Sequence, residues 1–460
     1  MKHSTLLGFN DDSTELGRAK ERYRRIILTS TVSGTARVVS IVTSLITIPL
    51  ALNYLGNEGY GIWMTISSLI NILSLADFGI GNGLISAISS ASGSGDRQAC
   101  KKYVSSAFFM LLAISFIIFL AFMLVYPNVS WSKIFNISSD RAIKEAGLAV
   151  AAWVGCLIVN IIVGIAQKVY WGFQEGYIND FCYIVGPILS LAGVLLIIHA
   201  DGGLPWLVFV SSAGQTISLT FNFLYLFFFK RIWLMPRFKF LDLFYMKKLV
   251  KLGISFFALN IAITVTAATD NIVNAQLFGA SAVAEYSIIS RLFSVIGVVL
   301  NIVTIPLWPA YGEAIARGDI GWVRKAFFKS ILVSLFIASI CSLGVIIFAS
   351  DVTYLWVKQT FVWSPLFLLG FGLLAVISAL ENPIVALLNG AQAIRIQSNW
   401  AVIMAGASVC GKLVLGYSYG LTGIIWANVI AHIVFFLVPL TLFIYHSPSK
   451  LFLQGRGRPC

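Results

Sequence analysis

The stretch VSSAFFMLLAISFIIFLAFMLVY, residues 104–126, carries no charged side chain over a length that can cross a membrane. A spanning helix needs about 20 mainly apolar residues. The whole chain shares this character, because 58% of its 460 residues are hydrophobic and only 11% are charged. About a quarter of residues are charged in soluble proteins. The composition therefore excludes a soluble globular protein and predicts an all-α polytopic membrane protein.

Reading outward from this stretch for similar apolar runs gives twelve predicted transmembrane helices. The predicted spans are residues 32–54, 59–85, 104–126, 144–166, 180–199, 205–229, 253–277, 284–308, 330–349, 362–388, 399–418 and 421–445. A polar leader, residues 1–30, precedes the first span and contains no signal-peptide cleavage pattern. We therefore expect the first span to remain in the mature protein.

The distribution of Lys and Arg predicts the orientation in the membrane. Alternate connections carry 25 basic residues on one side and four on the other. Because basic residues accumulate in cytoplasmic loops, both termini are expected in the cytoplasm. The net charge of +13 thus reflects topology, and nothing indicates nucleic-acid binding. The six cysteines stand far apart, so neither a disulfide framework nor a metal site is predicted.

The longest basic connection divides the spans six and six. It predicts an N-terminal bundle at 1–229, a cytoplasmic linker at 230–252 and a C-terminal bundle at 253–460. The linker alternates aromatic with basic residues and is expected to lie on membrane lipids.

The two halves share short sequence patterns. The Gly-Asp pair at 95–96 falls on that at 318–319 when the chain is shifted by 223 residues, and a weaker echo joins GFQ at 172–174 with GAQ at 390–392. Because six is an even number of spans, both halves enter the membrane from the same side. The pattern predicts a parallel pseudo-twofold repeat of two six-helix bundles around a central cavity.

The segments LGNEGYGIWMTISSLINILSLADFGIGNGL (55–84), GSGDRQACKKYVSSAF (93–108) and ATDNIVNAQLFGASAVAEYSIISRLFSV (268–295) resemble the polysaccharide transport family of bacterial flippases. This family includes Wzx-type O-antigen and repeat-unit translocases, within the multidrug/oligosaccharidyl-lipid/polysaccharide superfamily. The resemblance implies a multi-pass protein of the bacterial inner membrane that moves an undecaprenyl-diphosphate-linked oligosaccharide to the outer leaflet by alternating access. It also implies a polysaccharide polymerase and a chain-length regulator as partners.

Six charged residues lie inside the predicted spans, where each costs roughly 2.5–3.5 kcal/mol unless it has a polar cavity or a partner. Three are basic: Arg37, Arg291 and Lys412. We expect them to bind the diphosphate or acidic sugars, since basic groups suit phosphate oxygens. The related lipid II flippases carry headgroup-binding arginines on spans 1 and 8, the spans of the two arginines here. The alternative is that each basic residue pairs with an acid.

The other three are acidic: Asp270, Asp77 and Glu381. We expect them to couple transport to H⁺ or Na⁺, with no other cofactor. Asp270 is the best candidate, because neighbouring Thr and Asn residues offer further oxygen ligands, and its structural alternative is a pair with Arg291. Asp77 and Glu381 stand beside glycines and a proline, so each is expected at a helix break.

The sequence leaves three competing functions open. A multidrug extrusion cation antiporter usually carries an acid on span 1, where this chain has Arg37. A membrane polymerase or ligase-type glycosyltransferase needs a large outer loop, and the longest here, 127–143, holds Asp140 as its only acid. A passive scramblase needs no coupling carboxylate. The glycines at 79, 81 and 83 lack the setting of a nucleotide-binding loop, so ATP is not indicated. A secondary transporter, not an enzyme, is the favoured interpretation.

Overall fold

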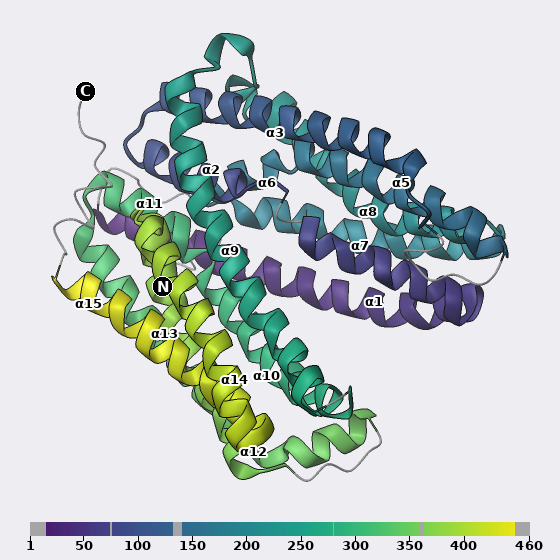
Figure 1. Ribbon diagram of the computed structural model, residues 1–460. Helices are drawn as coiled ribbons and strands as arrows, with labels where there is room; N and C mark the ends of the chain where they lie inside the picture. Colours follow the sequence, from purple (N-terminus) through teal and green to yellow (C-terminus); the bar gives the residue numbers. More distant parts are fainter. Residues whose placement is uncertain (1–14, 74–75, 132–139, 279, 358–362, 447–460) are drawn as a thin grey trace, which may run out of the picture. The chain divides into compact units, whose positions relative to one another are not determined.

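The computed structural model describes residues 15–73, 76–131, 140–278, 280–357 and 363–446 (Figure 1). Within these residues the chain forms helices and no β-strand. They separate into two compact units, one made of Arg22–Gly253 and the other of α1 up to Glu21 together with Ile254 onward. Each unit is described on its own.

The first unit contains the N-terminal helices. They are α1 (Glu15–Leu73, whose first residues belong to the second unit), α2 (Ile80–Gly93), α3 (Arg97–Val125), η1 (Tyr126–Asn128), α5 (Asp140–Val163), α6 (Ile165–Gly172), α7 (Gly176–His199), α8 (Gly203–Leu224), η2 (Tyr225–Lys230), η3 (Ile232–Leu234) and η4 (Phe238–Phe240). One apolar core joins α2, α3 and α6, with Leu84, Val104 and Tyr170 among its buried side chains.

The second unit contains the C-terminal helices. They are α9 (Leu243–Phe278, whose first residues belong to the first unit), α10 (Ala280–Thr304), α11 (Leu307–Arg317), α12 (Ile320–Val357), α13 (Pro365–Gly390), α14 (Ile394–His432), η5 (Ile433–Leu437) and α15 (Val438–His446). Its core is rich in aromatic side chains, and Tyr286, Phe293 and Phe371 pack together there.

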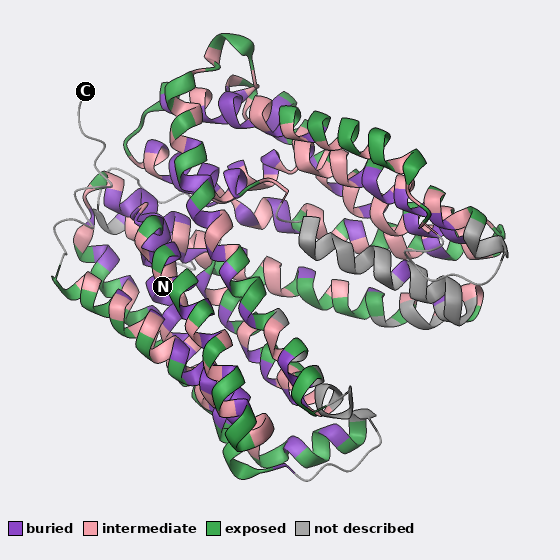
Figure 2. Cartoon of the chain, viewed as in Figure 1, coloured by how far each residue is buried: buried purple, intermediate pink, exposed green. Residues whose placement is uncertain are grey.

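Ten segments of the described residues are long and apolar enough to cross a membrane. Eight of them each overlap one of the predicted spans from 104–126 to 362–388. The outward side of α3 carries exposed apolar residues, such as Leu124 at 73% and Ile117 at 64% exposure (Figure 2). Such surfaces are suited to lipid rather than water. The chain is therefore a multi-pass membrane protein.

The Gly-Asp turns of the two halves have the same backbone geometry. Gly95 and Gly318 have φ angles of 74° and 83°, and in each turn the following Asp N–H donates to a carbonyl five residues earlier. Glycine adopts this left-handed backbone conformation at little energetic cost, because it has no Cβ. The sequence similarity between the two halves thus corresponds to a shared structure, in which this turn connects a short helix (α2 or α11) to a long one (α3 or α12).

The second, weaker echo is also present. Gln174 and Gln392 both adopt a positive φ, of 58° and 57°, in turns with equivalent backbone hydrogen bonds. These turns connect α6 to α7 and α13 to α14. Each unit therefore contains both turns in the same order.

The two Gly-Asp turns use their carboxylates differently. Asp96 caps α3, accepting a hydrogen bond of 2.8 Å from the Ala99 N–H. Asp319 instead accepts two hydrogen bonds from the guanidinium of Arg18, at 2.9 and 3.1 Å, although 301 residues separate the two in sequence. The first residues of α1 are thereby anchored to the start of α12, inside the second unit.

An ionic cluster ties the turn after α6 to the end of η2. Glu175 accepts hydrogen bonds from Lys230 Nζ at 2.9 Å and from Arg231 Nη2 at 3.0 Å. Burial raises the pKa of the Glu175 carboxyl, but Arg231 and Lys230 together outweigh that effect and hold its pKa below the ordinary value of 4.5. The Arg231 guanidinium also lies 3.9 Å from the centre of the Phe173 ring.

Candidate functional site

A buried ion pair joins two helices of the second unit. Lys412 lies on α14 and Asp270 on α9, with 2.7 Å between Lys412 Nζ and Asp270 Oδ1. The lysine side chain is completely buried and that of the aspartate is 18% exposed. Because a lone charge is costly in a protein interior, each of these charges stabilises the other.

Three oxygen atoms surround the Lys412 ammonium group. Besides Asp270, they are the Thr266 carbonyl at 2.7 Å and Thr269 Oγ1 at 3.1 Å. An ammonium group has three hydrogen-bond donors and no acceptor, so this set satisfies it. A carboxylate, a carbonyl and a hydroxyl are also the ligand types that hard metal cations prefer. Of the Thr and Asn neighbours expected to supply oxygens, Thr266 and Thr269 contact this group, and the oxygens enclose an ammonium group.

A kink in α14 lets both parts of this helix reach Asp270. Gly420 has φ 65° and ψ −148°, a conformation that is essentially restricted to glycine. Lys412 precedes the kink and Asn428 follows it, and the Asn428 amide donates to Asp270 Oδ1 at 2.9 Å. Ser408 in turn donates to Asn428 Oδ1 at 2.7 Å.

The two arginines of the predicted headgroup site lie elsewhere. Arg37 on α1 and Arg291 on α10 are both exposed on their own units. Neither side chain forms a hydrogen bond or an ion pair with a residue of the described ranges. The alternative prediction of an ion pair between Asp270 and Arg291 is therefore wrong, because Asp270 pairs with Lys412 instead.

A second carboxylate–base pair lies in the same unit. Glu381, which is 6% exposed, contacts His432 Nδ1 through both oxygens at 3.1 Å. The prediction of a helix break at Glu381 is wrong, because α13 runs from Pro365 to Gly390 with Pro383 inside it. Its carboxylate thus meets an imidazole at the end of α14.

The predicted helix break at Asp77 is present in the first unit. Asp77 lies in the turn before α2, where Oδ1 accepts from the Gly79 N–H at 2.8 Å and Oδ2 from the Gly81 N–H at 3.2 Å. Unpaired N–H groups at a helix N-terminus favour negative charge. The Asp77 carboxylate therefore caps the N-terminus of α2.

The sequence analysis missed a buried carboxylate on α7. Asp180, 7% exposed, accepts hydrogen bonds from the Ser33 hydroxyl and, at 2.9 Å, from the Asn179 amide. Asn222 on α8 extends the network to Asn179 at 2.7 Å. Arg37 is close enough to interact electrostatically with Asp180. The available signal was the Asn-Asp pair in the first turn of α7.

Solved structures that share this fold include membrane transporters. A structure described as MATE in the bent conformation matches with a TM-score of 0.78 and 14% identity, covering 95% of this chain and 97% of that one. A MOP superfamily transporter from Pyrococcus furiosus matches with a TM-score of 0.79 and 13% identity, covering 97% of this chain and all of that one. At these identities the likeness concerns the fold alone, a helical fold of the kind formed by two-bundle transporters.

Sequence relatives have a narrower range of names. A Yersinia pseudotuberculosis protein named "Putative O-antigen export protein" is 24% identical over 64% of this chain and 66% of its own length, just under two thirds. A Salmonella typhi protein named "Putative O-antigen transporter" is 21% identical over 68% of this chain and 71% of its own.

The sequence profile of one protein family also matches the chain. That family is described as "Polysaccharide biosynthesis protein", and the match runs over residues 27–315, from within α1 to near the end of α11. This match confirms the resemblance carried by the segments at 55–84, 93–108 and 268–295. The chain belongs to the polysaccharide biosynthesis protein family.

Proposed function

We propose that the protein is a flippase that carries undecaprenyl-diphosphate-linked oligosaccharide units from the cytoplasmic to the outer leaflet of the bacterial inner membrane. Its family and the O-antigen names of its relatives support this cargo. A secondary transporter rather than an enzyme fits these names. A polymerase and a chain-length regulator that act on the transported units complete the expected set of partners.

We further propose twelve crossings, arranged as two parallel six-helix bundles with both termini in the cytoplasm. Helix α1 has 59 residues and the segment Ile394–His446 has 53, so each is long enough to cross twice. The shared turns of the two units support an internal repeat. Alternating access would then move one bundle against the other around the cargo.

The exposed guanidinium groups of Arg37 and Arg291 carry the proposal. Each lies within an apolar helix, on the surface of its own unit. A charge facing lipid there costs roughly 2.5–3.5 kcal/mol, whereas a water-filled path with a diphosphate in it turns the same charge into a binding group. These basic groups favour an anionic cargo over the cationic drugs of a multidrug antiporter.

The paired carboxylates of the second unit supply the proposed coupling to H⁺ or Na⁺. Asp270 and Glu381 each face a base, Lys412 and His432 respectively. A proton or a Na⁺ ion that enters either pair must displace or neutralise that base. If the pairs differ between inward-open and outward-open states, the ion gradient drives the cycle. This proposal assigns Lys412 to the coupling centre, whereas the sequence predicted it in the headgroup site.

The test is surface glycan in cells that lack the gene and are complemented with variants. We expect Arg37→Ala combined with Arg291→Ala to abolish surface glycan and to accumulate lipid-linked oligosaccharide, with normal protein in the membrane. Lysine at either position should restore only part of the activity, because it lacks the planar fork of arginine. Arg395→Ala removes an exposed arginine at the start of α14 and is the matched control. Normal surface glycan in the double variant would refute the headgroup role.

A further inference from the structure

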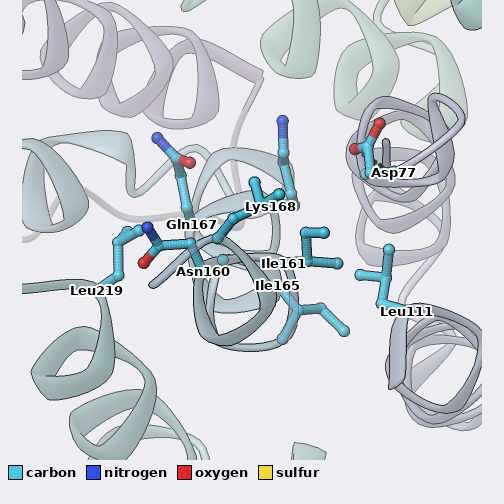
Figure 3. Close-up of a pocket in the computed structure, with 11 residues that line it drawn as sticks. Asp77, Leu111, Asn160, Ile161, Ile165, Gln167, Lys168 and Leu219 are labelled. Carbon is cyan, nitrogen blue, oxygen red and sulfur yellow. Dashed lines mark hydrogen bonds between the residues drawn. The ribbon is translucent and has the colours of Figure 1, made fainter. Parts of the chain in front are cut away.

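A cavity of about 240 Å³ lies in the first unit, where the turn before α2 meets α3, α5, α6 and α8 (Figure 3). Four polar residues line it: Asp77, Asn160, Gln167 and Lys168. In the view of Figure 3, Gln167 and Lys168 point the same way and Asp77 stands across from Lys168. Leucine and isoleucine side chains, Leu111 and Ile161 among them, form the remaining wall.

Lys168 brings a positive charge to this cavity. Its alkyl chain passes over Gly81, where an added Cβ would lie 2.8 Å from Lys168 Cε. Its ammonium group donates to Asn82 Oδ1 at 3.3 Å and forms no ion pair within the described part of the chain. An ammonium group has three donors, so two remain for a ligand.

The other polar groups offer hydrogen-bond acceptors. Asn160 Oδ1 is buried and has no partner among the residues described. A ligand hydroxyl would supply the hydrogen bond that this acceptor lacks. Both oxygens of Asp77 already bind N–H groups of α2, but a carboxylate has about four lone-pair positions and can accept further bonds.

The charge of Asp77 does not cancel that of Lys168. The α2 N-terminus compensates the carboxylate through the Gly79 and Gly81 N–H groups. The ammonium group donates to one neutral amide oxygen and has Asp77 nearby, with no ion pair between the two. Lys168 would therefore repel a cation that enters the cavity, whereas it offers an anion two hydrogen-bond donors.

The size of the cavity limits the ligand to one ring. At about 30 Å³ per water molecule, 240 Å³ holds about eight waters, and it lies below the ~300 Å³ at which drug-sized pockets begin. Hydroxyl groups suit the acceptors, an anionic group suits Lys168, and the C–H face of a ring suits the leucine and isoleucine wall. A sugar phosphate combines all three.

We infer that this cavity binds a single phosphorylated sugar ring, the glycosyl-phosphate part of the cargo, with Lys168 on the phosphate and Asn160 on a ring hydroxyl. This inference rests on the proposed function. The predicted topology places Lys168 near the cytoplasmic ends of its helices, so the cavity would take the first sugar before the units rearrange.

The experiment is calorimetric titration of the purified full-length protein with glucose 1-phosphate and galactose 1-phosphate, with glucose and with inorganic phosphate. A hexose 1-phosphate should bind at least tenfold more tightly than either glucose or phosphate. Phosphate that binds as well as the sugar phosphates would overturn the inference, because the site would then recognise an anion only.

Two substitutions separate the roles. Lys168→Met should weaken hexose 1-phosphate binding at least tenfold and leave glucose binding unchanged, and Lys168→Arg should retain most of the affinity. Asn160→Leu should weaken the binding of both the sugar and the sugar phosphate. Lys247→Met, an exposed lysine on α9 in the same unit, is the matched control and should change neither. Equal affinities in Lys168→Met and wild type would overturn the assignment of the phosphate.

The outcomes distinguish this cavity from the flippase proposal. If the purified protein binds no hexose 1-phosphate while complemented cells display normal glycan, the cavity assignment fails and the flippase stands. If titration behaves as expected but cells without the protein keep their surface glycan, the flippase fails and the sugar-phosphate site stands.

Discussion

Removing the Lys412 ammonium group should destabilise the second unit strongly. Lys412→Met keeps the length and apolar stem of the side chain but leaves Asp270 with Asn428 as its remaining side-chain hydrogen-bond donor. Taking one partner from a buried ion pair costs about 3–5 kcal/mol, because the other charge stays buried. Asp270→Asn should cost a similar amount, since it leaves the ammonium group with two neutral oxygens.

The double variant decides between a charge effect and loss of packing. Lys412→Met with Asp270→Asn removes both charges, so its cost should fall below the sum of the single costs by about 3 kcal/mol. The assay is unfolding of the purified protein in mild detergent with increasing denaturing detergent, with folded protein measured at each step. Lys247→Met, at an exposed position, should stay within about 0.5 kcal/mol of wild type. Additive costs in the double variant would refute the reasoning from charge.

Two further predictions concern stability. Because the folded-state pKa of Glu175 lies below 4.5, its ionic cluster stabilises the protein above that pH, and this contribution is lost as pH falls through the lowered pKa. Glu175→Gln should therefore lower the free energy of unfolding at pH 7 and flatten its pH dependence in acid. An unchanged pH dependence in acid would contradict this prediction. Gly420→Ala should cost about 1–3 kcal/mol from backbone strain alone, since nothing lies within 4 Å of an added Cβ. The matched control is Gly406→Ala, at an equally open helical position, which should be neutral or slightly stabilising. Equal melting temperatures for the two variants would contradict this prediction.

Apolar runs between charged loops predict membrane-spanning helices well, and most of the spans predicted for this chain coincide with long apolar helices in the structure. Nine predicted spans overlap one candidate membrane segment each. The predicted limits at 399–418 and 421–445 fall instead within one continuous segment, Ile394–His446. Gly420 nevertheless interrupts this segment, because its φ of 65° and ψ of −148° are not helical. Ser408 before Gly420 donates a hydrogen bond to Asn428 after it, so the chain turns back on itself at the break that the sequence predicts between the two limits.

The candidate site shows a different limit. Charged residues in apolar runs identified Asp270 and Lys412, but their pairing depends on which faces of α9 and α14 meet, and that is set by packing between helices far apart in sequence. Asp180 escaped notice because it lies at the edge of a predicted span, where a charge costs little by itself. In the fold, Ser33 donates a hydrogen bond to Asp180 and Asn222 donates one to the neighbouring Asn179, both from helices distant in sequence. Sequence pattern locates a buried charge more readily than it names its partner.

The anchoring of Arg18 by Asp319 has a consequence for biogenesis. The ribosome makes the basic end of this contact first and its acidic end 301 residues later. At about 5–20 residues per second, the start of α1 waits roughly 15–60 seconds for its partner to be synthesised. The contact between Arg18 and Asp319 can therefore form only after the start of α12 has been made, so the first residues of α1 join the second unit late in synthesis.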